Sequence, residues 1–239
     1  MNKTNIFHLS SREVSLLIYL AQNRAIEKEI EITTTKLAEV FSISQQTASR
    51  CLLKLGEMGI ITWKSSPKGS LVQLRPAGVS ILHKFRFEIE RALHPDLTSI
   101  TIRGNVFSGL GEGKYYISRT LYMQSFVSKL GYKPYLGTLN LRIQTNDSDR
   151  LDLIRGSWPV IIPGFEEEGR RFGDVLCYPL TIPKIDAKIA GIIPRRTHYG
   201  PNILELISDV CLREVLDLDD GDEVTVVFSF DQNAGSDNK

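Results

Sequence analysis

Hydrophobic residues in the first third of the chain recur at the spacing of helices. The segment SREVSLLIYLAQNRAI places apolar side chains along one face, and Ser10 or Ser11 is a suitable N-cap for it. Two more helical patterns, TTTKLAEVF and QQTASRCLLKLGEMG, are separated by a tight turn. We expect Thr34 or Thr35 to cap the first of these and Ser44 to cap the second. The pattern predicts three helices, the last two joined as a helix-turn-helix.

A hairpin and a closing helix follow. The alternating runs ITWK and SLVQL flank the turn-forming sequence SSPKG, which is typical of a β-hairpin. Residues 77–93 return to helical spacing, and the sequence HPD ends that helix. This order of elements is that of a winged helix-turn-helix, whose second motif helix enters the DNA major groove. We therefore predict a winged helix-turn-helix domain at residues 1–95.

The remainder of the chain, residues 96–239, has a different texture. Six short β-rich runs are punctuated by Gly and Pro: SITIRGNVFSG, KPYLGTLNLRI, WPVIIPGF, GDVLCYPLTI, KIAGIIPRR and DEVTVVFSF. The segments YYISRTLYMQSFVSKLG and LELISDVCLREVL instead favour helices. Because the helices do not alternate regularly with the strands, the pattern argues against a doubly wound sheet. We predict an α+β chain of two domains, the second a compact β-barrel with inserted helices.

Composition adds a charge asymmetry and excludes some classes. The net charge of +1 conceals 13 Lys and Arg against 8 Asp and Glu in residues 1–95, or +5, and 16 against 20 in the remainder, or −4. The chain has no apolar run of the roughly 18–20 residues that span a bilayer and no signal-peptide pattern, so no membrane association is expected. Three cysteines without a CxxC pair suit reduced thiols in the cytoplasm better than a zinc site.

The predicted recognition helix begins SQQTASR, and its polar residues could contact DNA bases and phosphates. Lys64 and Lys68 of the hairpin are suited to phosphate contact. Small helical domains also serve as docking or dimerisation units, and polar residues on an outward helix face are often simply solvated. Both interpretations remain open from the residues alone. The candidate DNA-binding residues are Gln45, Gln46, Thr47, Ser49 and Arg50.

The segment RGNVFSGLGEGKYY carries four glycines between a predicted strand and a predicted helix. Glycines let the backbone approach an anion closely, and N–H groups at a helix start can bind phosphate. Lys114 would add positive charge. The pattern matches neither the phosphate loop of nucleoside triphosphatases nor the dinucleotide fingerprint. By itself it also fits an ordinary glycine-rich turn.

Three further groups of polar residues are candidates for chemistry. Thr138 and Asn140 are two apart, so on a strand they project to one side and offer neutral oxygens that suit Mg²⁺, although the pair also fits an ordinary strand edge. Glu205 is expected to open a helix, where negative charge is favourable. The acidic sequence DLDDGD at residues 217–222 fits an exposed turn better than a metal cluster, because it lacks the closing Glu of an EF-hand.

Together, GNVFSGLGEGKYY, YLGTLNLRI and the later RTHY…ILELIS…CLREVLDLDDGDEV resemble the archaeal-type CTP-dependent riboflavin kinases over residues 97–230. The resemblance implies a cradle-loop, six-stranded β-barrel that transfers the γ-phosphate of CTP to the 5′-hydroxyl of riboflavin, giving FMN and CDP. Some members of the family also carry an N-terminal helix-turn-helix. A fused pair of this kind could regulate transcription in response to flavin.

The resemblance also implies roles for individual residues. Thr138 and Asn140 would hold Mg²⁺, Thr197 and Glu205 would contact the flavin, and Glu205 is a candidate for the catalytic base. The alternative is a DNA-binding regulator whose barrel senses a ligand without catalysis, which would not need the metal pair. A structural module would bind no nucleotide at all. The implied nucleotide-binding residues are Gly109, Leu110, Gly111, Glu112, Gly113 and Lys114, with Val210, Cys211, Leu212 and Arg213 as a second segment.

Overall fold

The computed structural model describes residues 8–194 and 200–230, and its contacts divide the chain into two units, Met1–Glu90 and Arg91–Lys239. The division falls inside helix α4 rather than after residue 95, where the sequence pattern placed it. Within the second unit the Arg91 guanidinium lies 5.9 Å from the centroid of the Phe230 ring, which joins the last turn of that helix to this unit.

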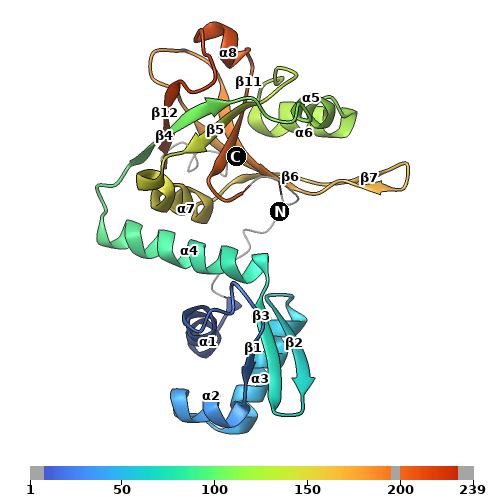
Figure 1. Cartoon of the computed structure of the whole chain (residues 1–239), viewed down its shortest axis with the longest axis vertical. Coiled ribbons are helices and arrows are strands. Elements are labelled where there is room, and N and C mark those ends of the chain that lie inside the picture. The colour runs from blue at the N-terminus through green and yellow to red at the C-terminus, as the bar shows by residue number, and fades with distance from the viewer. Residues whose placement is uncertain (1–7, 195–199, 231–239) are drawn as a thin grey trace, which may run out of the picture. The chain divides into compact units, whose positions relative to one another are not determined.

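The first unit combines helices with a small antiparallel sheet (Figure 1). The sheet has the order β1-β3-β2. Strands β2 and β3 form the predicted hairpin, whereas the additional strand β1 was not predicted. The helices and sheet enclose a core that includes Leu17, Leu37, Leu52 and Val72. The elements are α1 (Ser11–Gln22), β1 (Ile30–Ile32), α2 (Thr34–Phe41), α3 (Gln45–Glu57), β2 (Ile61–Ser66), β3 (Gly69–Leu74) and α4 (Pro76–Leu93).

The helix starts follow from local hydrogen bonds. Ser10 caps α1 in a capping box with Glu13, and Ser44 accepts from the Thr47 backbone N–H at the start of α3, as predicted. The cap of α2 is Thr33, not Thr34 or Thr35, because Thr33 has the extended backbone that lets its hydroxyl accept the Lys36 N–H at 3.1 Å.

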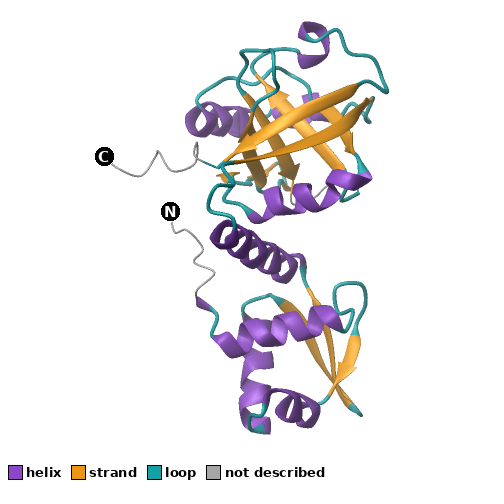
Figure 2. Cartoon of the chain, turned by 90° about the vertical axis from the view of Figure 1, so that its left-hand side faces the viewer, coloured by secondary structure: helices purple, strands orange, loops and turns teal. Residues whose placement is uncertain are grey.

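The second unit is built on a large antiparallel sheet (Figure 2). Its seven strands have the order β12-β4-β5-β11-β10-β9-β6. A two-stranded hairpin, β7-β8, stands apart from it. The strands are β4 (Ser99–Phe107), β5 (Leu139–Ile143), β6 (Val160–Ile162), β7 (Glu166–Glu167), β8 (Arg170–Arg171), β9 (Val175–Leu180), β10 (Ile189–Pro194), β11 (Ile203–Ser208) and β12 (Glu223–Ser229). The helices are α5 (Gly113–Ile117), α6 (Thr120–Leu130), the 3₁₀ turn η2 (Thr145–Asp147), α7 (Ser148–Gly156) and α8 (Leu212–Val215).

The large sheet is curled, so that β12 at one edge approaches the end of β9, the strand next to the other edge. Beyond the continuous ladders, one isolated bridge joins Thr181, just after β9, to Val227 in β12, with N···O distances of 2.9 and 2.8 Å. Continuous pairing does not close the sheet into a barrel among the described residues. The coarse prediction of an α+β chain is confirmed, and the structure shows that the strands of the large sheet are antiparallel.

One helical prediction in the second unit needs correction, and one helix was missed. Residues 203–208 form strand β11, so Glu205 lies within a strand and does not open a helix. The reason is pairing on both sides: Leu206 lies opposite Gly191 of β10 and Leu139 of β5, which the sequence around residue 205 does not reveal. Helix α7 was not predicted, because its pattern SDRLDLIRG is short and polar. None of the described helices is long and apolar enough to cross a membrane.

Candidate functional site

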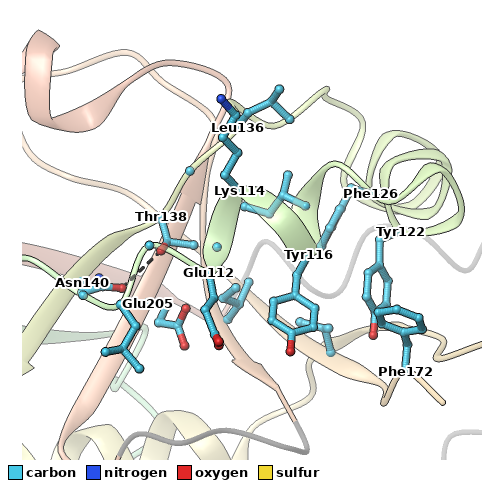
Figure 3. Close-up of a pocket in the computed structure, with 18 of the residues that line it drawn as sticks. Glu112, Lys114, Tyr116, Tyr122, Phe126, Leu136, Thr138, Asn140, Phe172 and Glu205 are labelled. Carbon is cyan, nitrogen blue, oxygen red and sulfur yellow. Dashed lines mark hydrogen bonds between the residues drawn. The ribbon is translucent and has the colours of Figure 1, made fainter. Parts of the chain in front are cut away.

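A cavity of about 930 Å³ lies in the second unit, and it collects most of the residues singled out from the sequence (Figure 3). Its walls come from the loop after β4, the start of α5, the strands β5 and β11, and the hairpin β7-β8. A volume of this size holds a substantial organic ligand. The predicted residues that line it are Gly109, Leu110, Gly111, Glu112, Gly113, Lys114, Thr138, Asn140, Glu205 and Arg213.

The glycine loop, residues 108–113, needs glycine at two positions for different reasons. Gly111 has φ +76°, a left-handed conformation that is strained for any other common residue, and it faces open space. At Gly113, the first residue of α5, an added Cβ would lie 2.7 Å from the Thr138 hydroxyl oxygen. This close approach brings the loop end directly against β5.

Thr138 and Asn140 project toward each other at the start of β5, as Figure 3 shows. The Thr138 hydroxyl lies 3.2 Å from the Asn140 side-chain oxygen. The strand register places Asn140 opposite Phe107 of β4 on one side and opposite Glu205 of β11 on the other. Residues directly opposite in neighbouring strands share a face, so Asn140 and Glu205 form a polar pair on the cavity side of the sheet.

The Glu205 carboxyl lies in a mainly apolar setting. It shares its sheet face with Ile207 and lies opposite Ile192, and both of these isoleucines belong to the apolar cluster beneath α5 and α6. Burial, and secondarily the negative charge of Glu112, raises the pKa of Glu205 from 4.5 to about 7. Glu205 is therefore a partly shielded acid that can change its protonation state near neutral pH.

The other end of the cavity is aromatic. Tyr122 and Phe172 line this end, and both pack on Phe165, which is not part of the lining. The rings of Phe165 and Phe172 stack with their centroids 4.6 Å apart, and Tyr122 meets Phe165 edge-on at 4.7 Å. The hairpin adds Arg170, which donates hydrogen bonds of 3.2 Å to the hydroxyls of Tyr115 and Tyr116. In Figure 3 the side chains of Tyr116, Tyr122, Phe126 and Phe172 gather on the opposite side from Thr138 and Asn140.

Sequence reasoning missed this aromatic end. Its residues come from α5, α6 and the β7-β8 hairpin, and no spacing in the sequence links them. The one local signal was EEEGRRF, in which Glu168 and Gly169 both have positive φ, as a tight hairpin turn requires. The turn could have been predicted, but not its position beside the tyrosines of α5.

Several predicted residues stand outside the cavity lining. Val210, Cys211 and Leu212 precede or begin α8 without lining the cavity, whereas Arg213 does line it. Thr197 lies outside the described residues. Lys114 lines the cavity, but its side chain extends away from Glu112 and Glu205 (Figure 3).

The acidic turn at residues 217–222 carries no metal cluster. Among the residues that the structure describes, no group of three or more His, Cys, Asp or Glu side chains could hold a metal ion. The four aspartates of this turn are exposed, as expected for a surface turn. The oxygens of Thr138 and Asn140 are the candidate metal ligands named from the sequence.

In the first unit, the candidate DNA-binding residues lie at the start of α3. The side chains of Gln46, Ser49 and Arg50 are exposed. The exposed Gln45 donates a hydrogen bond of 3.1 Å to the Thr35 hydroxyl. Thr47 is half-buried, with its hydroxyl 2.8 Å from that of Ser44, so it is part of the helix cap.

The cavity and its walls define a ligand-binding α+β domain with a polar end beside a glycine loop and an aromatic end. A family model named CTP-dep_RFKase and described as "Domain of unknown function DUF120" matches residues 106–228, which contain every lining residue of the cavity. The chain belongs to this family of CTP-dependent riboflavin kinases.

Curated relatives agree over most of the chain. The riboflavin kinase of Pyrococcus abyssi is 40% identical over 218 residues, covering 91% of this chain and 99% of that protein. The riboflavin kinase of Archaeoglobus fulgidus is 41% identical over 216 residues, covering 89% and 90%. That of Methanosarcina barkeri is 32% identical over 214 residues, covering 90% and 94%. The similarity therefore extends through both units.

Proposed function

We propose that the protein is a riboflavin kinase that transfers the γ-phosphate of CTP to the 5′-hydroxyl of riboflavin. The observation that carries this proposal is one cavity that joins the glycine loop, the Thr138–Asn140 pair and an aromatic end within the family-matched segment. Phosphoryl transfer depends on positioning and charge neutralisation more than on covalent chemistry with the protein. A cavity with one polar and one aromatic end suits a nucleotide phosphate meeting a flavin.

The substrates are assigned to the two ends by their chemistry. The exposed, glycine-rich loop offers backbone N–H groups and close approach to the phosphates of CTP, and residues 210–213 are the second proposed nucleotide contact. The rings of Tyr116, Tyr122 and Phe172 suit the flat isoalloxazine ring of riboflavin. The ribityl chain would then lead toward Glu205, and Thr197 is the other proposed flavin contact.

The residues present fit a magnesium ion. The Thr138 hydroxyl and the Asn140 amide oxygen are 3.2 Å apart at the polar end, and both are neutral oxygen donors. Mg²⁺ typically binds through one or two protein oxygens together with substrate phosphates and water. When bound, the ion would neutralise phosphate charge. We propose Thr138 and Asn140 as its protein ligands.

We propose Glu205 as the group that accepts the proton of the riboflavin hydroxyl. Three carboxylates line the cavity within the described residues: Glu112, Asp174 and Glu205. Asp174 accepts the Gly164 N–H at 2.9 Å, and Glu112 is exposed on the loop. Glu205 lies directly opposite Asn140, where the phosphate and the hydroxyl would meet.

Incubation of the purified protein with riboflavin, Mg²⁺ and either CTP or ATP tests the proposed reaction. We expect FMN to accumulate with CTP, with CDP formed in equal amount, and addition of EDTA to stop it. FMN can be separated from riboflavin by chromatography and measured by fluorescence. Absence of FMN with both nucleotides would rule out the kinase, whereas FMN formed preferentially with ATP would refute the assignment of CTP.

We also propose that the first unit is a winged helix-turn-helix that binds double-stranded DNA, and that the curled sheet of the second unit corresponds to the six-stranded barrel of the family. The helix pair α2–α3, the β2-β3 hairpin, and the exposed Arg50 and Lys68 support the DNA-binding proposal. Confirmed DNA binding would support a role for the whole protein in regulating transcription in response to flavin.

Substitution of Arg50 by alanine tests DNA binding. Phosphate contacts make affinity fall steeply with salt, so we expect the wild-type protein to bind mixed duplex DNA in a salt-sensitive way, and Arg50→Ala to weaken binding about tenfold. Arg24→Ala, outside the helix pair, serves as the matched control and should bind as the wild type does. Fluorescence anisotropy at two salt concentrations measures both. Binding that is absent or insensitive to salt would favour a docking role.

A further inference from the structure

The acidic turn at residues 217–222 contacts the first residue of the glycine loop through a single carboxylate. Asp220 Oδ2 accepts the Ser108 backbone N–H at 3.0 Å. Its other oxygen, Oδ1, accepts the Ser108 hydroxyl at 3.1 Å and Arg213 Nη2 at 2.8 Å. We refer to Asp220 with these two partners as the Asp220 bridge. The bridge connects the loop after β4 to helix α8, two segments that are far apart in the sequence.

Backbone pairing fixes the position of Asp220. The Gly221 N–H donates to the Val106 carbonyl at 2.8 Å, and the Val106 N–H donates to the Asp222 carbonyl at 2.9 Å. The Asn105 side chain also donates to the Gly221 carbonyl at 3.0 Å. The acidic turn therefore continues the β4-β12 ladder to the end of β4. Asp220 is held beside Ser108 just where the strand gives way to the glycine loop.

The acidic turn also holds the Arg213 side chain in place. Besides its bond to Asp220, it donates to the Leu218 carbonyl at 3.4 Å. Hydrogen bonds from Arg213, and then from the Ser108 backbone, lower the pKa of Asp220, so its carboxylate stays charged at neutral pH. Ser108 and Arg213 both line the cavity, whereas Asp220 does not.

We propose that Asp220 is a positioning residue for the nucleotide: it holds the start of the glycine loop and Arg213 in a fixed relation, so that both can contact the same CTP molecule. This inference rests on the proposed kinase function. Because Asp220 is exposed, the bridge contributes little to global stability. Its effect is on the conformation of the glycine loop before CTP binds. A loop that is already held in its binding conformation loses less conformational entropy when CTP binds.

The substitution Asp220→Asn tests this role with almost no change in shape. Both carboxylate oxygens act as acceptors in the bridge, whereas an asparagine side chain has one acceptor oxygen and a donor NH₂ group. Asparagine must therefore lose either the Ser108 N–H or the Arg213 contact. Asp220→Ala loses both. Asp219→Ala removes a negative charge from the same turn without touching the bridge, so it controls for the change in charge.

Calorimetric titration with CTP alone, and separately with riboflavin, gives the decisive readout, together with steady-state KM values. We expect Asp220→Asn and Asp220→Ala to raise the Kd and KM for CTP about tenfold, to leave the Kd for riboflavin within twofold, and to shift Tm by less than about 4 °C. Asp219→Ala should match the wild type in each measurement.

Three outcomes would overturn the inference. In the first, CTP binding by both Asp220 variants stays within twofold of the wild type. In the second, the affinities for CTP and riboflavin fall together with a large loss of Tm, which would mark a merely structural role. In the third, Asp219→Ala weakens CTP binding equally, which would assign the effect to charge. Failure of the kinase proposal is distinct, because the wild-type protein itself would then form no FMN.

Discussion

Replacement of Asn140 by alanine is expected to reduce FMN formation at least about 100-fold while the protein stays folded, and Thr138→Ala should act in the same direction. Loss of a metal ligand removes charge neutralisation worth several kcal/mol at the transferring phosphate, and 1.36 kcal/mol corresponds to a factor of ten in rate. The two oxygens lie 3.2 Å apart, so each substitution should weaken the same site. The measurement is kcat as a function of Mg²⁺ concentration, with circular dichroism to verify the fold.

Thr101→Ala is a suitable control for these variants. Thr101 lies on β4 of the same sheet, is exposed, and does not line the cavity. It should retain wild-type activity and the wild-type Mg²⁺ dependence. If Thr138→Ala and Asn140→Ala both keep full activity, the proposed metal role is wrong. Activity that is restored to either variant by high Mg²⁺ would support the role directly.

Glu205→Gln is expected to lower kcat by about 100-fold or more, because a positioned general base typically contributes 10²–10⁴ in rate.

The same substitution should stabilise the protein at alkaline pH in EDTA. The pKa of Glu205 is raised from 4.5 to about 7, so its neutral form is favoured in the folded state. The associated stability is fully present below about pH 4.5 and is lost as pH rises through about 7.

Above pH 7 the wild-type protein therefore carries a buried charge that the glutamine variant lacks. The raised pKa of Glu205 corresponds to at most about 3 kcal/mol in the free energy of unfolding at pH 8, and the glutamine variant should be no more stable than the wild type at pH 4. Thermal unfolding of both proteins at the two pH values, in EDTA, measures this difference. Glu214→Gln, on the exposed side of α8, is the matched control and should change neither kcat nor the pH dependence of Tm. A Glu205→Gln variant with kcat within twofold of wild type would refute the proton-acceptor role.

The helix N-termini and the glycine loop show how much of the structure can be predicted from residues that are close in the sequence. Ser10 and Ser44 cap their helices through hydrogen bonds that span three residues, so the pattern alone located Ser44 and narrowed the other cap to Ser10 or Ser11. The predicted cap of α2, Thr34 or Thr35, was one or two residues too late, because three consecutive threonines have the same capping ability and only the backbone conformation of Thr33 selects it. The glycines of the loop were noted from the sequence, whereas the left-handed φ of Gly111 was found only in the structure.

Glu205 shows where local reasoning fails. The pattern of residues 204–216 favours a helix, yet residues 203–208 pair with β5 and β10, and these long-range ladders override the local preference. The same pairing brings Glu205 opposite Asn140 and raises its pKa by burial. Neither consequence could have been derived from the neighbours of Glu205 in the chain.

The sequence by itself determined the glycine loop, the closely spaced Thr138–Asn140 pair, the cap of α3, the β2-β3 hairpin and the strands β4, β5, β6, β9, β10 and β12. Each of these depends on interactions among residues a few positions apart. Only the tertiary structure decided that Glu205 faces Asn140, that an aromatic end completes the cavity, and that Asp220 joins Ser108 to Arg213. These relations depend on strand register and loop packing between distant segments, where the free energy of burial and pairing outweighs local preference.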